Sequence, residues 1–401
     1  MHPSDEIRGV KSKRLLNKKI ILGITGSISS VECVKLSREL IRHGAEVIPV
    51  MTHASTKIIN PDAIWFATGK QPIVELTGKT EHVFFCGKVK NPADLLLISP
   101  CTSNTISKIA HGVDDTSVTT FATTAIGSKI PIIIVPAMHI SMYDHQIIQD
   151  NIRKLKKIGI TFIEPTLIEN KAKLADNDEI ISNVIKKTGK HDLKGKNILI
   201  IGGSTAEKID DVRVITNLSS GKTAIWLAKN AFFRDGNVEL WYGQSKEPVP
   251  DYIKTKRLTS INDLLKLLQN TNTKKFDIIF VCAAITDYIP NKQKGKITSN
   301  KDKLIIEMQN APKIISKIRK ITPKSKIIGF KIEDNPNKLK KSASDLLKTN
   351  HLDLVIGNTT SAFNKDYNEI WIINKKGKTL HKKGTKENLT NIIIDTILKQ
   401  K

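Results

Sequence analysis

Short apolar runs alternate with amphipathic stretches through the first half of the chain. Residues 18–25 (KKIILGIT) form a continuous apolar run, and residues 27–44 carry apolar side chains at helical spacing and end at Gly44. This pattern predicts a buried strand followed by a helix. Further apolar runs lie at 45–51, 94–100, 131–136 and 161–165. Continuous apolar strands separated by helices predict a parallel sheet with helices on both faces.

A polar segment at 186–196 interrupts this pattern, which then restarts. We place the domain boundary there, with domains at 1–190 and 191–401. The second half predicts a helix at 219–236, a strand pair around a KKGK turn at 369–381, and a final helix at 386–399. Its predicted strands are 196–203, 238–243, 276–284, 325–332 and 352–358. The expected fold class is therefore α/β, with two doubly wound domains.

Length and cysteine content exclude several protein classes. The 401 residues fit two domains rather than one core. No apolar run approaches the roughly 20 residues of a membrane-spanning helix, and residues 1–14 lack the apolar segment of a secretory signal. Cys33, Cys86, Cys101 and Cys282 are scattered without a CxxC pair, which argues against a zinc ribbon or a disulfide scaffold. We expect a reducing, cytoplasmic location.

The net charge of +25 and the pI near 9.7 permit two interpretations. A protein this basic can bind nucleic acid. Aromatic residues make up only 5% of the chain, however, and the lysines are dispersed, with the densest groups at 292–303, 313–326 and 338–348. We favour solvated lysine-rich faces, with anionic small-molecule substrates as a second contribution.

Both halves open with a strand, a glycine-containing turn and a helix. In the first, residues 23–30 (GITGSISS) place Gly26 and several hydroxyls at a helix start. Free backbone N–H groups there favour a phosphate, although many α/β domains have such a turn. In the second, residues 201–224 contain a glycine pair and then the turn SSGK, where Lys222 adds charge. A standard P-loop is not expected, because Thr216 replaces the first glycine of GxxxxGK.

Two further loops follow strands, where open α/β sheets bind ligands. Residues 99–107 (SPCTSNTIS) are rich in small polar side chains, and residues 135–145 bring His139, Met142 and Tyr143 to the same edge. Either loop alone could simply cap the next helix. His82 lies between polar residues and an apolar pair, and its position leaves a structural and a catalytic role open.

Longer motifs narrow these choices. GITGSIS, EHVFF, ADLLLISPCTSNTISKIAHGVDD and VPAMHISMY in the first half resemble a flavoprotein decarboxylase. In the second half, IGGSTAEKIDDVRVITNLSSGKT, CAAITDY, KGK at 294–296, IIGFKIE and DLVIGN resemble a ligase. Over about residues 15–395 the chain resembles the archaeal-type bifunctional phosphopantothenoylcysteine decarboxylase/phosphopantothenate–cysteine ligases of coenzyme A synthesis. The resemblance implies a flavodoxin-like flavoprotein domain of the HFCD type and a Rossmann-like ligase domain.

For the ligase half, the resemblance implies that CTP activates the carboxylate of 4′-phosphopantothenate and that the amine of cysteine captures the acyl-nucleotide. Some relatives use ATP instead, and Mg²⁺ is expected to bridge the phosphates. Asn217 would handle the acyl-nucleotide, and Lys296 would stabilise the phosphate during activation. Contacts to the phosphates would come from Gly203, Ser219, Ser220 and Gly221, while Ala284, Asp287 and Phe330 would frame the nucleotide.

For the flavoprotein half, the resemblance implies decarboxylation of 4′-phosphopantothenoylcysteine to 4′-phosphopantetheine. FMN would oxidise the thiol-bearing carbon, which creates an electron sink for the loss of CO₂, and would later return the electrons. His82 matches the active-site histidine of the family. The FMN-binding segments match Gly26, Ser27, Ser99, Thr102, Ser103 and Asn104, and the substrate-binding PAMxxxM segment matches Pro136, Ala137, Met138 and Met142.

The chain departs from the bacterial pattern in three places. His139 replaces an asparagine after PAM, and a histidine there could still donate a hydrogen bond to the substrate carboxylate. Residues 164–177, which match the substrate flap, contain no cysteine and carry Lys171 and Lys173 instead, so that Cys101 is the nearest alternative. The ligase lysine segment reads KGKITSN, so its role could belong to Lys294 rather than Lys296.

Several alternatives stay open at this point. One is a ligase whose flavoprotein domain binds FMN without decarboxylating, and another is a scaffold or regulatory subunit. The third is a basic nucleic-acid-binding protein, which explains the charge but none of the motifs. The expected partners are 4′-phosphopantothenate, cysteine, CTP and further copies of the chain, with trimeric flavoprotein domains and dimeric ligase domains that could build a dodecamer. We expect neither a membrane nor a nucleic acid as a partner.

Overall fold

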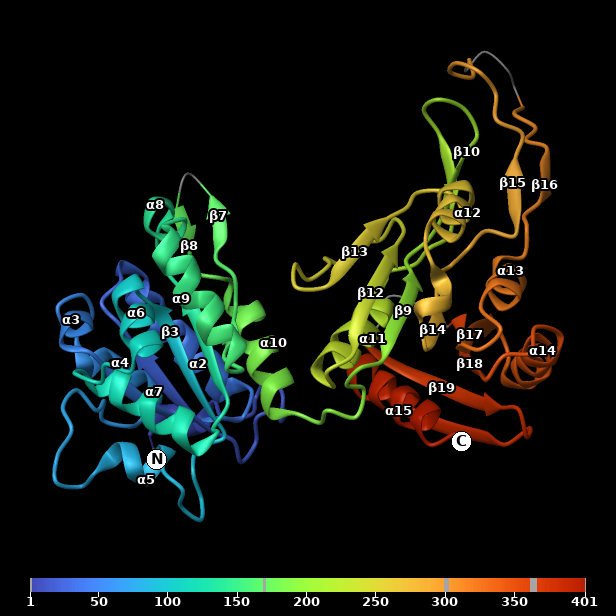
Figure 1. The fold of residues 1–401 in the computed structure, drawn as a ribbon. Helices are drawn as coiled ribbons and strands as arrows, with labels where there is room; N and C mark the ends of the chain where they lie inside the picture. Colours follow the sequence, from blue (N-terminus) through green and yellow to red (C-terminus); the bar gives the residue numbers. More distant parts are fainter. Residues whose placement is uncertain (1, 169–170, 299–302, 361–365, 401) are drawn as a thin grey trace. The chain divides into compact units, whose positions relative to one another are not determined.

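The computed structural model describes residues 2–168, 171–298, 303–360 and 366–400. The chain divides into two compact units, Met1–Gly189 and Lys190–Lys401. Each unit has its own sheet and its own apolar core (Figure 1). Among the described residues, no helix has the length and apolar character needed to cross a bilayer.

The first unit is built on a parallel five-stranded sheet in the order β2-β1-β3-β4-β6. This order is that of a flavodoxin-like doubly wound fold, and it confirms the predicted fold class. The last strand is shorter than predicted, because the backbone leaves the sheet after Ile163 and Pro165 has no N–H to donate. The strands are β1 (Lys19–Ile24), β2 (Glu46–Met51), β3 (Leu95–Cys101), β4 (Ile132–Pro136) and β6 (Thr161–Phe162).

Helices cover both faces of this sheet. α6, α7 and α9 pack on the face that carries Ile21, Leu96 and Ile98, while α10 contacts β3 and α2. A small antiparallel sheet, β5-β8-β7, lies beside α8 (Figure 1). The remaining elements are α1 (Pro3–Glu6), η1 (Ile28–Glu32), α2 (Cys33–Arg42), α3 (His53–Thr56), α4 (Pro61–Thr68), α5 (Glu81–Cys86), α6 (Ser103–His111), α7 (Ser117–Ser128), β5 (Met138–His139), α8 (Ile140–Tyr143), α9 (Gln146–Lys157), β7 (Thr166–Ile168), β8 (Lys171–Lys173) and α10 (Asn177–Thr188).

The helix predicted at 27–44 is wrong in its first part. Its first residues form the 3₁₀ turn η1, and the α-helix α2 begins only at Cys33. The Ser30 hydroxyl donates to the carbonyl oxygens of Thr25 (2.8 Å) and Ser27 (2.5 Å), so a side chain competes with the helical backbone pattern.

The second unit is built on an eight-stranded sheet in the order β13-β12-β9-β14-β17-β18-β19-β20. The first six strands in this order are parallel, which is the doubly wound Rossmann arrangement, and β19 and β20 add an antiparallel hairpin. The predicted strand pair around KKGK is confirmed. The strands are β9 (Asn197–Gly202), β12 (Asn237–Tyr242), β13 (Lys254–Arg257), β14 (Ile278–Val281), β17 (Lys326–Glu333), β18 (Leu354–Thr359), β19 (Tyr367–Asn374) and β20 (Thr379–Thr385).

One core cluster of this unit lies under α11 and α15, and the other lies under α12, α13 and α14 on the opposite face. Two small hairpins, β10-β11 and β15-β16, extend from the same end of the sheet (Figure 1). The bounds are β10 (Ala206–Lys208), β11 (Val214–Thr216), α11 (Lys222–Phe233), α12 (Ile261–Asn270), η2 (Thr273–Lys275), β15 (Tyr288–Pro290), β16 (Met308–Asn310), α13 (Ile314–Ile321), α14 (Pro336–Thr349) and α15 (Lys386–Leu398).

Candidate active sites

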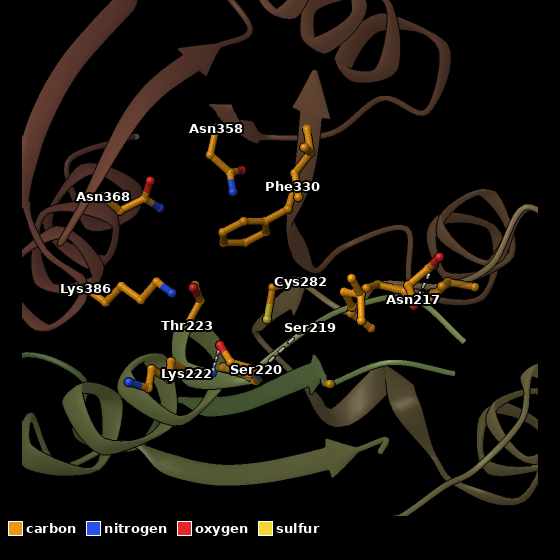
Figure 2. A pocket seen from close by; sticks show the side chains of 18 of the residues that line it. Asn217, Ser219, Ser220, Lys222, Thr223, Cys282, Phe330, Asn358, Asn368 and Lys386 are labelled. Atoms are coloured by element: carbon orange, nitrogen blue, oxygen red, sulfur yellow. Dashed lines mark hydrogen bonds between the residues drawn. The ribbon is translucent and has the colours of Figure 1, made fainter. Parts of the chain in front are cut away.

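The second unit has a pocket of about 470 Å³ at the carboxyl ends of β9, β14, β17 and β18. The strand order reverses between β9 and β14, and open α/β sheets bind ligands at such a point. Figure 2 shows the pocket with side chains from both sides directed into it. It brings together residues that the sequence assigns to the nucleotide and its intermediate: Gly203, Asn217, Ser219, Ser220, Gly221, Ala284, Asp287 and Phe330.

Two glycines shape the phosphate-facing wall. Gly203 has φ +78°, and a Cβ there would lie 2.9 Å from the backbone nitrogen of Gly243. Gly221 has φ +77° and directly precedes α11, so the helix begins later than predicted and Ser219 and Ser220 lie in the turn before it. The first residues of α11, Lys222, Thr223 and Ala224, line the pocket, and a helix start in such a position attracts phosphate.

Asn217 is tied to the backbone that crosses the pocket. Its side-chain amide donates to the Ala284 carbonyl at 3.2 Å, and the same carbonyl accepts from the Thr205 N–H at 3.3 Å. Ala284 in turn donates its N–H to the Gly203 carbonyl at 2.8 Å. Asn217 itself is exposed, so a ligand in the pocket can reach the amide.

The loop that carries Lys294 and Lys296 does not line this pocket. Both lysines are exposed, and the loop is bound to the segment between β10 and β11. Asp211 accepts from the Gly295 N–H at 2.9 Å, and Asp210 accepts from the Ile297 N–H at 3.1 Å. The structure thus brings Lys296 beside the hairpin that leads to Asn217, but not into the pocket.

Of the two aspartates that bind this loop, Asp210 accepts more hydrogen bonds. Its side chain is buried and also accepts from Arg213, through the backbone N–H at 2.6 Å and through Nη1 at 2.6 Å. Loss of solvation opposes ionisation, yet the N–H groups of Ile297, Arg213 and Val212 together with the guanidinium hold the pKa of Asp210 well below its usual range. The carboxylate therefore stays charged at any pH at which the enzyme could work.

The pocket also contains residues that the sequence analysis did not assign: Thr223, Cys282, Asn358, Asn368 and Lys386. Lys386 begins α15, far along the chain from the glycine turns, and the chain around it is so rich in lysine that nothing in the sequence singles it out. Lys222, which we expected to add a positive charge near the phosphates, pairs with Asp366 at 2.6 Å. This hydrogen bond raises the pKa of Lys222.

The first unit has a pocket of about 830 Å³ at the carboxyl ends of β1, β2 and β3. Among the residues assigned from the sequence, Gly26, Thr102, Ser103, Asn104 and Met142 line it. A Cβ on Gly26 would lie 2.6 Å from the Cβ of Ala54, so a side chain at this position would collide with the wall of the pocket. Hydroxyl groups at the starts of α6 and α7 line another wall, and Val74, Leu76 and Met142 supply apolar surface.

Other assigned residues of the first unit lie outside this pocket. Ser27 precedes η1, and Ser99 is buried in β3 with its hydroxyl unpaired within the described part of the chain. His82 lies on α5, and its Nδ1 is buried with no partner among the described residues. Pro136 and Ala137 are buried at the end of β4, before Met138 and His139 form β5.

Three groups near the substrate segment were candidates to replace the family's flap cysteine or asparagine: His139, the lysines of β8, and Cys101 at the end of β3. His139 is exposed and accepts a hydrogen bond from the Ser141 N–H at 3.2 Å. Its backbone pairs with Lys171 of β8, but the side chains of Lys171 and Lys173 lie outside the described part of the structure. Cys101 is fully buried in the core, and burial raises its pKa, which removes this thiol as the replacement for a flap cysteine.

Comparison with family models agrees with the division of the chain into two units. Residues 9–189 match the family model described as Flavoprotein, and residues 193–400 match the C-terminal domain of the DNA/pantothenate metabolism flavoprotein. A flavoprotein of this name from Streptococcus pneumoniae has a solved structure with a TM-score of 0.46 and 25% identity, which covers 51% of this chain and 98% of that one.

Curated relatives match over the whole length. The coenzyme A biosynthesis bifunctional protein CoaBC of Thermococcus kodakarensis is 42% identical over 100% of this chain and 99% of its own. The protein of the same name from Methanocaldococcus jannaschii is 40% identical over 100% of this chain and 98% of its own. With both halves matched in the same order, the chain belongs to the CoaBC family of bifunctional coenzyme A biosynthesis proteins.

Proposed function

We propose that this protein joins 4′-phosphopantothenate to cysteine in its second unit and decarboxylates the product in its first unit. The observation that supports this most strongly is the pocket of the second unit. The residues that the family motif assigns to phosphates, nucleotide and intermediate come from distant segments, and they line this pocket together. Two separate pockets, one in each unit, suit two successive reactions.

In the ligase reaction the substrate carboxylate attacks the α-phosphate of CTP and pyrophosphate leaves. The developing negative charge needs fixed donors, which the N–H groups at the start of α11 and the turn at Ser219 and Ser220 can provide. Asn217 then holds the acyl-nucleotide while the cysteine amine attacks its carbonyl, which forms the amide, breaks the acyl–phosphate bond and releases CMP and the proton of the amine. The described residues contain no group of three possible metal ligands. We therefore infer that Mg²⁺ is bound mainly through the phosphates.

In the decarboxylation, bound FMN supplies the redox chemistry that makes loss of CO₂ possible. The first pocket suits a cofactor with a phosphate and an apolar ring, because it combines helix starts rich in hydroxyls with the apolar side chains of Val74, Leu76 and Met142. A larger residue in place of Gly26 would occupy part of the space that the cofactor needs. The residues that line it would hold the cofactor, while His139 would orient the substrate carboxylate.

We infer that the flavoprotein unit acts as a homo-oligomer, with a trimer as the expected form. Large apolar side chains are exposed on α5, which carries His82, and on α4: Phe84 of α5 is 63% exposed, and Phe66 and Trp65 of α4 are 58% and 44% exposed. Exposed apolar surface of this kind marks an interface. Since His82 does not line the pocket of its own copy, association would allow it to act at the pocket of a neighbour.

The ligase unit has its own exposed apolar residues, on and next to the two hairpins. Leu218 is 80% exposed, Val212 65% and Tyr288 54%, and β10 contacts β15. We infer that these hairpins pair with a second copy, which makes the ligase unit a dimer. We also infer a cytoplasmic location, with which four free cysteines agree.

The test is a single incubation of the purified chain with 4′-phosphopantothenate, cysteine, CTP and Mg²⁺, with products identified by mass spectrometry. Formation of 4′-phosphopantetheine supports both activities, and a parallel incubation with ATP decides the nucleotide. Accumulation of 4′-phosphopantothenoylcysteine would favour a ligase with an inactive flavoprotein unit, an alternative motivated by the buried Cys101. Absence of both products refutes the proposed function.

A further inference from the structure

Two lysines, Lys222 and Lys386, line the pocket of the second unit near the start of α11, and they differ in their surroundings. Lys222, the first residue of α11, forms an ion pair with Asp366, whose side chain is 81% exposed, so a carboxylate at the surface offsets its charge in part. Lys386, the first residue of α15, extends toward Thr223 and Phe330 inside the pocket, whereas Lys222 points away from them (Figure 2). Of these two lysines, Lys386 is the one whose ammonium group is directed into the pocket.

Lys386 is buried, and its ammonium group has no hydrogen-bond or ion-pair partner within the described part of the chain. Only 7% of the residue is exposed, and within the described residues no acceptor bonds its ammonium group and no carboxylate forms an ion pair with it. The surrounding wall is formed by Phe330, Asn358 and Asn368, with Leu389 nearby on the same helix. These neighbours fix the direction of the side chain without neutralising its charge.

An arrangement of this kind is unfavourable without a ligand. A buried charge without a counter-ion destabilises a folded protein unless another interaction compensates for the lost solvation. Burial, followed by repulsion from Lys222, lowers the pKa of Lys386, although Asp366 and Glu247 act in the opposite direction. Asn358 Oδ1 on the same wall is also buried without a hydrogen bond among the described residues. Two unsatisfied polar groups therefore face one cavity.

We propose that Lys386 is a ligand-binding residue of the ligase site, where it pairs with a phosphate group held at the start of α11. The N–H groups of α11 donate to the phosphate from one side, and the ammonium group approaches it from the other. This inference rests on the proposed ligase function and adds a residue that the sequence motifs do not contain. The phosphate can belong to the nucleotide or to 4′-phosphopantothenate, since both bring one to this pocket.

The experiment compares full-length wild type with Lys386→Met, which keeps the length of the stem and removes the charge. Calorimetric titrations use CTP with Mg²⁺, inorganic pyrophosphate and 4′-phosphopantothenate as separate probes. We expect the Kd for the ligand whose phosphate meets Lys386 to rise roughly tenfold to a hundredfold, as for other charge-assisted hydrogen bonds. Lys382→Met on β20 is the matched control, because Lys382 is exposed and is not one of the residues that line the pocket.

Thermal unfolding of the unliganded proteins separates binding from a structural role. Removing an unpaired buried charge should leave the Tm of Lys386→Met unchanged or raise it, whereas a structural lysine would lower it. Weaker binding of CTP and pyrophosphate assigns the residue to the nucleotide, and weaker binding of 4′-phosphopantothenate assigns it to that substrate. Unchanged affinity for every probe overturns the proposal. Lys386→Gln provides the same test if the methionine variant does not fold.

Failure of the two proposals gives different results. If wild type binds neither CTP nor 4′-phosphopantothenate, the proposed function itself is wrong. If wild type binds them and makes 4′-phosphopantothenoylcysteine, but Lys386→Met does so with the same KM values, only the role of Lys386 is refuted. A raised KM with little change in kcat is the expected kinetic result, because the charge contributes to binding before and during the reaction.

Discussion

Replacing Gly221 with alanine tests the turn that precedes α11. Gly221 has φ +77°, and an added Cβ would collide with the Tyr242 hydroxyl and lie 2.7 Å from Tyr242 Cζ and 2.9 Å from Ser245 Cβ. Tyr242 cannot move aside easily, because it is fully buried and donates to the Glu247 carbonyl at 3.2 Å. The substitution must therefore shift the turn or the ring.

The size of the effect follows from two contributions. Placing alanine in the left-handed conformation costs about 1–2 kcal/mol, and overpacking a filled core costs about 1–3 kcal/mol more. A loss of about 2–5 kcal/mol corresponds to a fall in Tm of roughly 4–20 °C for a unit of this size. Because Ser219 and Ser220 belong to the same turn, the KM for CTP should rise together with the loss of stability.

The assay combines thermal unfolding of the full chain with pyrophosphate release at varied CTP. Gly127→Ala is the matched control, since nothing lies within 4 Å of its added Cβ, which would fall near the end of α7 in the other unit. That change should stabilise slightly. Tyr242→Phe should recover part of the loss in the Gly221→Ala background. Unchanged Tm and CTP KM in Gly221→Ala would refute the description of this turn.

Three further predictions concern the two sites. His82→Asn should abolish CO₂ release and leave pyrophosphate release intact, and loss of both would contradict separate sites. Asn217→Asp should allow acyl-nucleotide formation but slow its capture by cysteine, because the amide that donates to Ala284 is lost; an unchanged single-turnover rate would remove Asn217 from the site. The pKa of Lys386 in the folded protein lies below its ordinary value of 10.5. At any pH between the folded pKa and 10.5, the unfolded chain therefore binds more protons than the folded one. Folding stability from this residue then rises with pH, and the Tm advantage of Lys386→Met should shrink in alkaline buffer and disappear near that ordinary value. An advantage independent of pH would show that the charge is not its cause.

Much of the sheet architecture could be predicted from the sequence, because buried parallel strands are continuous apolar runs. Residues 18–25 and 94–100 are examples, and both become central strands. β13 (KTKR) could not be predicted in this way, since an edge strand of charged residues carries no apolar pattern. Apolar periodicity predicts the start of the helix after Gly26 too early, because it contains no information on the hydrogen bond from Ser30 to the backbone.

The candidate site divides along similar lines. Gly203, Gly221 and Asn217 could be assigned because they lie in one continuous motif that the fold brings to a single pocket. Lys386 could not be assigned in this way, because its significance arises from its burial and from the absence of a counter-ion among the residues that the structure describes. Neither property is visible in a lysine-rich segment. The ion pair between Lys222 and Asp366 could not be predicted either, because Asp366 lies far along the chain and outside the motif that contains Lys222.

The burial of the cysteines has a consequence for an enzyme that handles thiols. Cys33, Cys86 and Cys101 are fully buried, and burial raises the pKa of Cys86 and of the pocket residue Cys282 to about 12. Thiol–disulfide exchange requires a thiolate, so these sulfur atoms are poor partners for an incoming disulfide. Cystine formed by oxidation of the substrate should therefore leave the enzyme unmodified, and catalysis should resume as soon as free cysteine is restored.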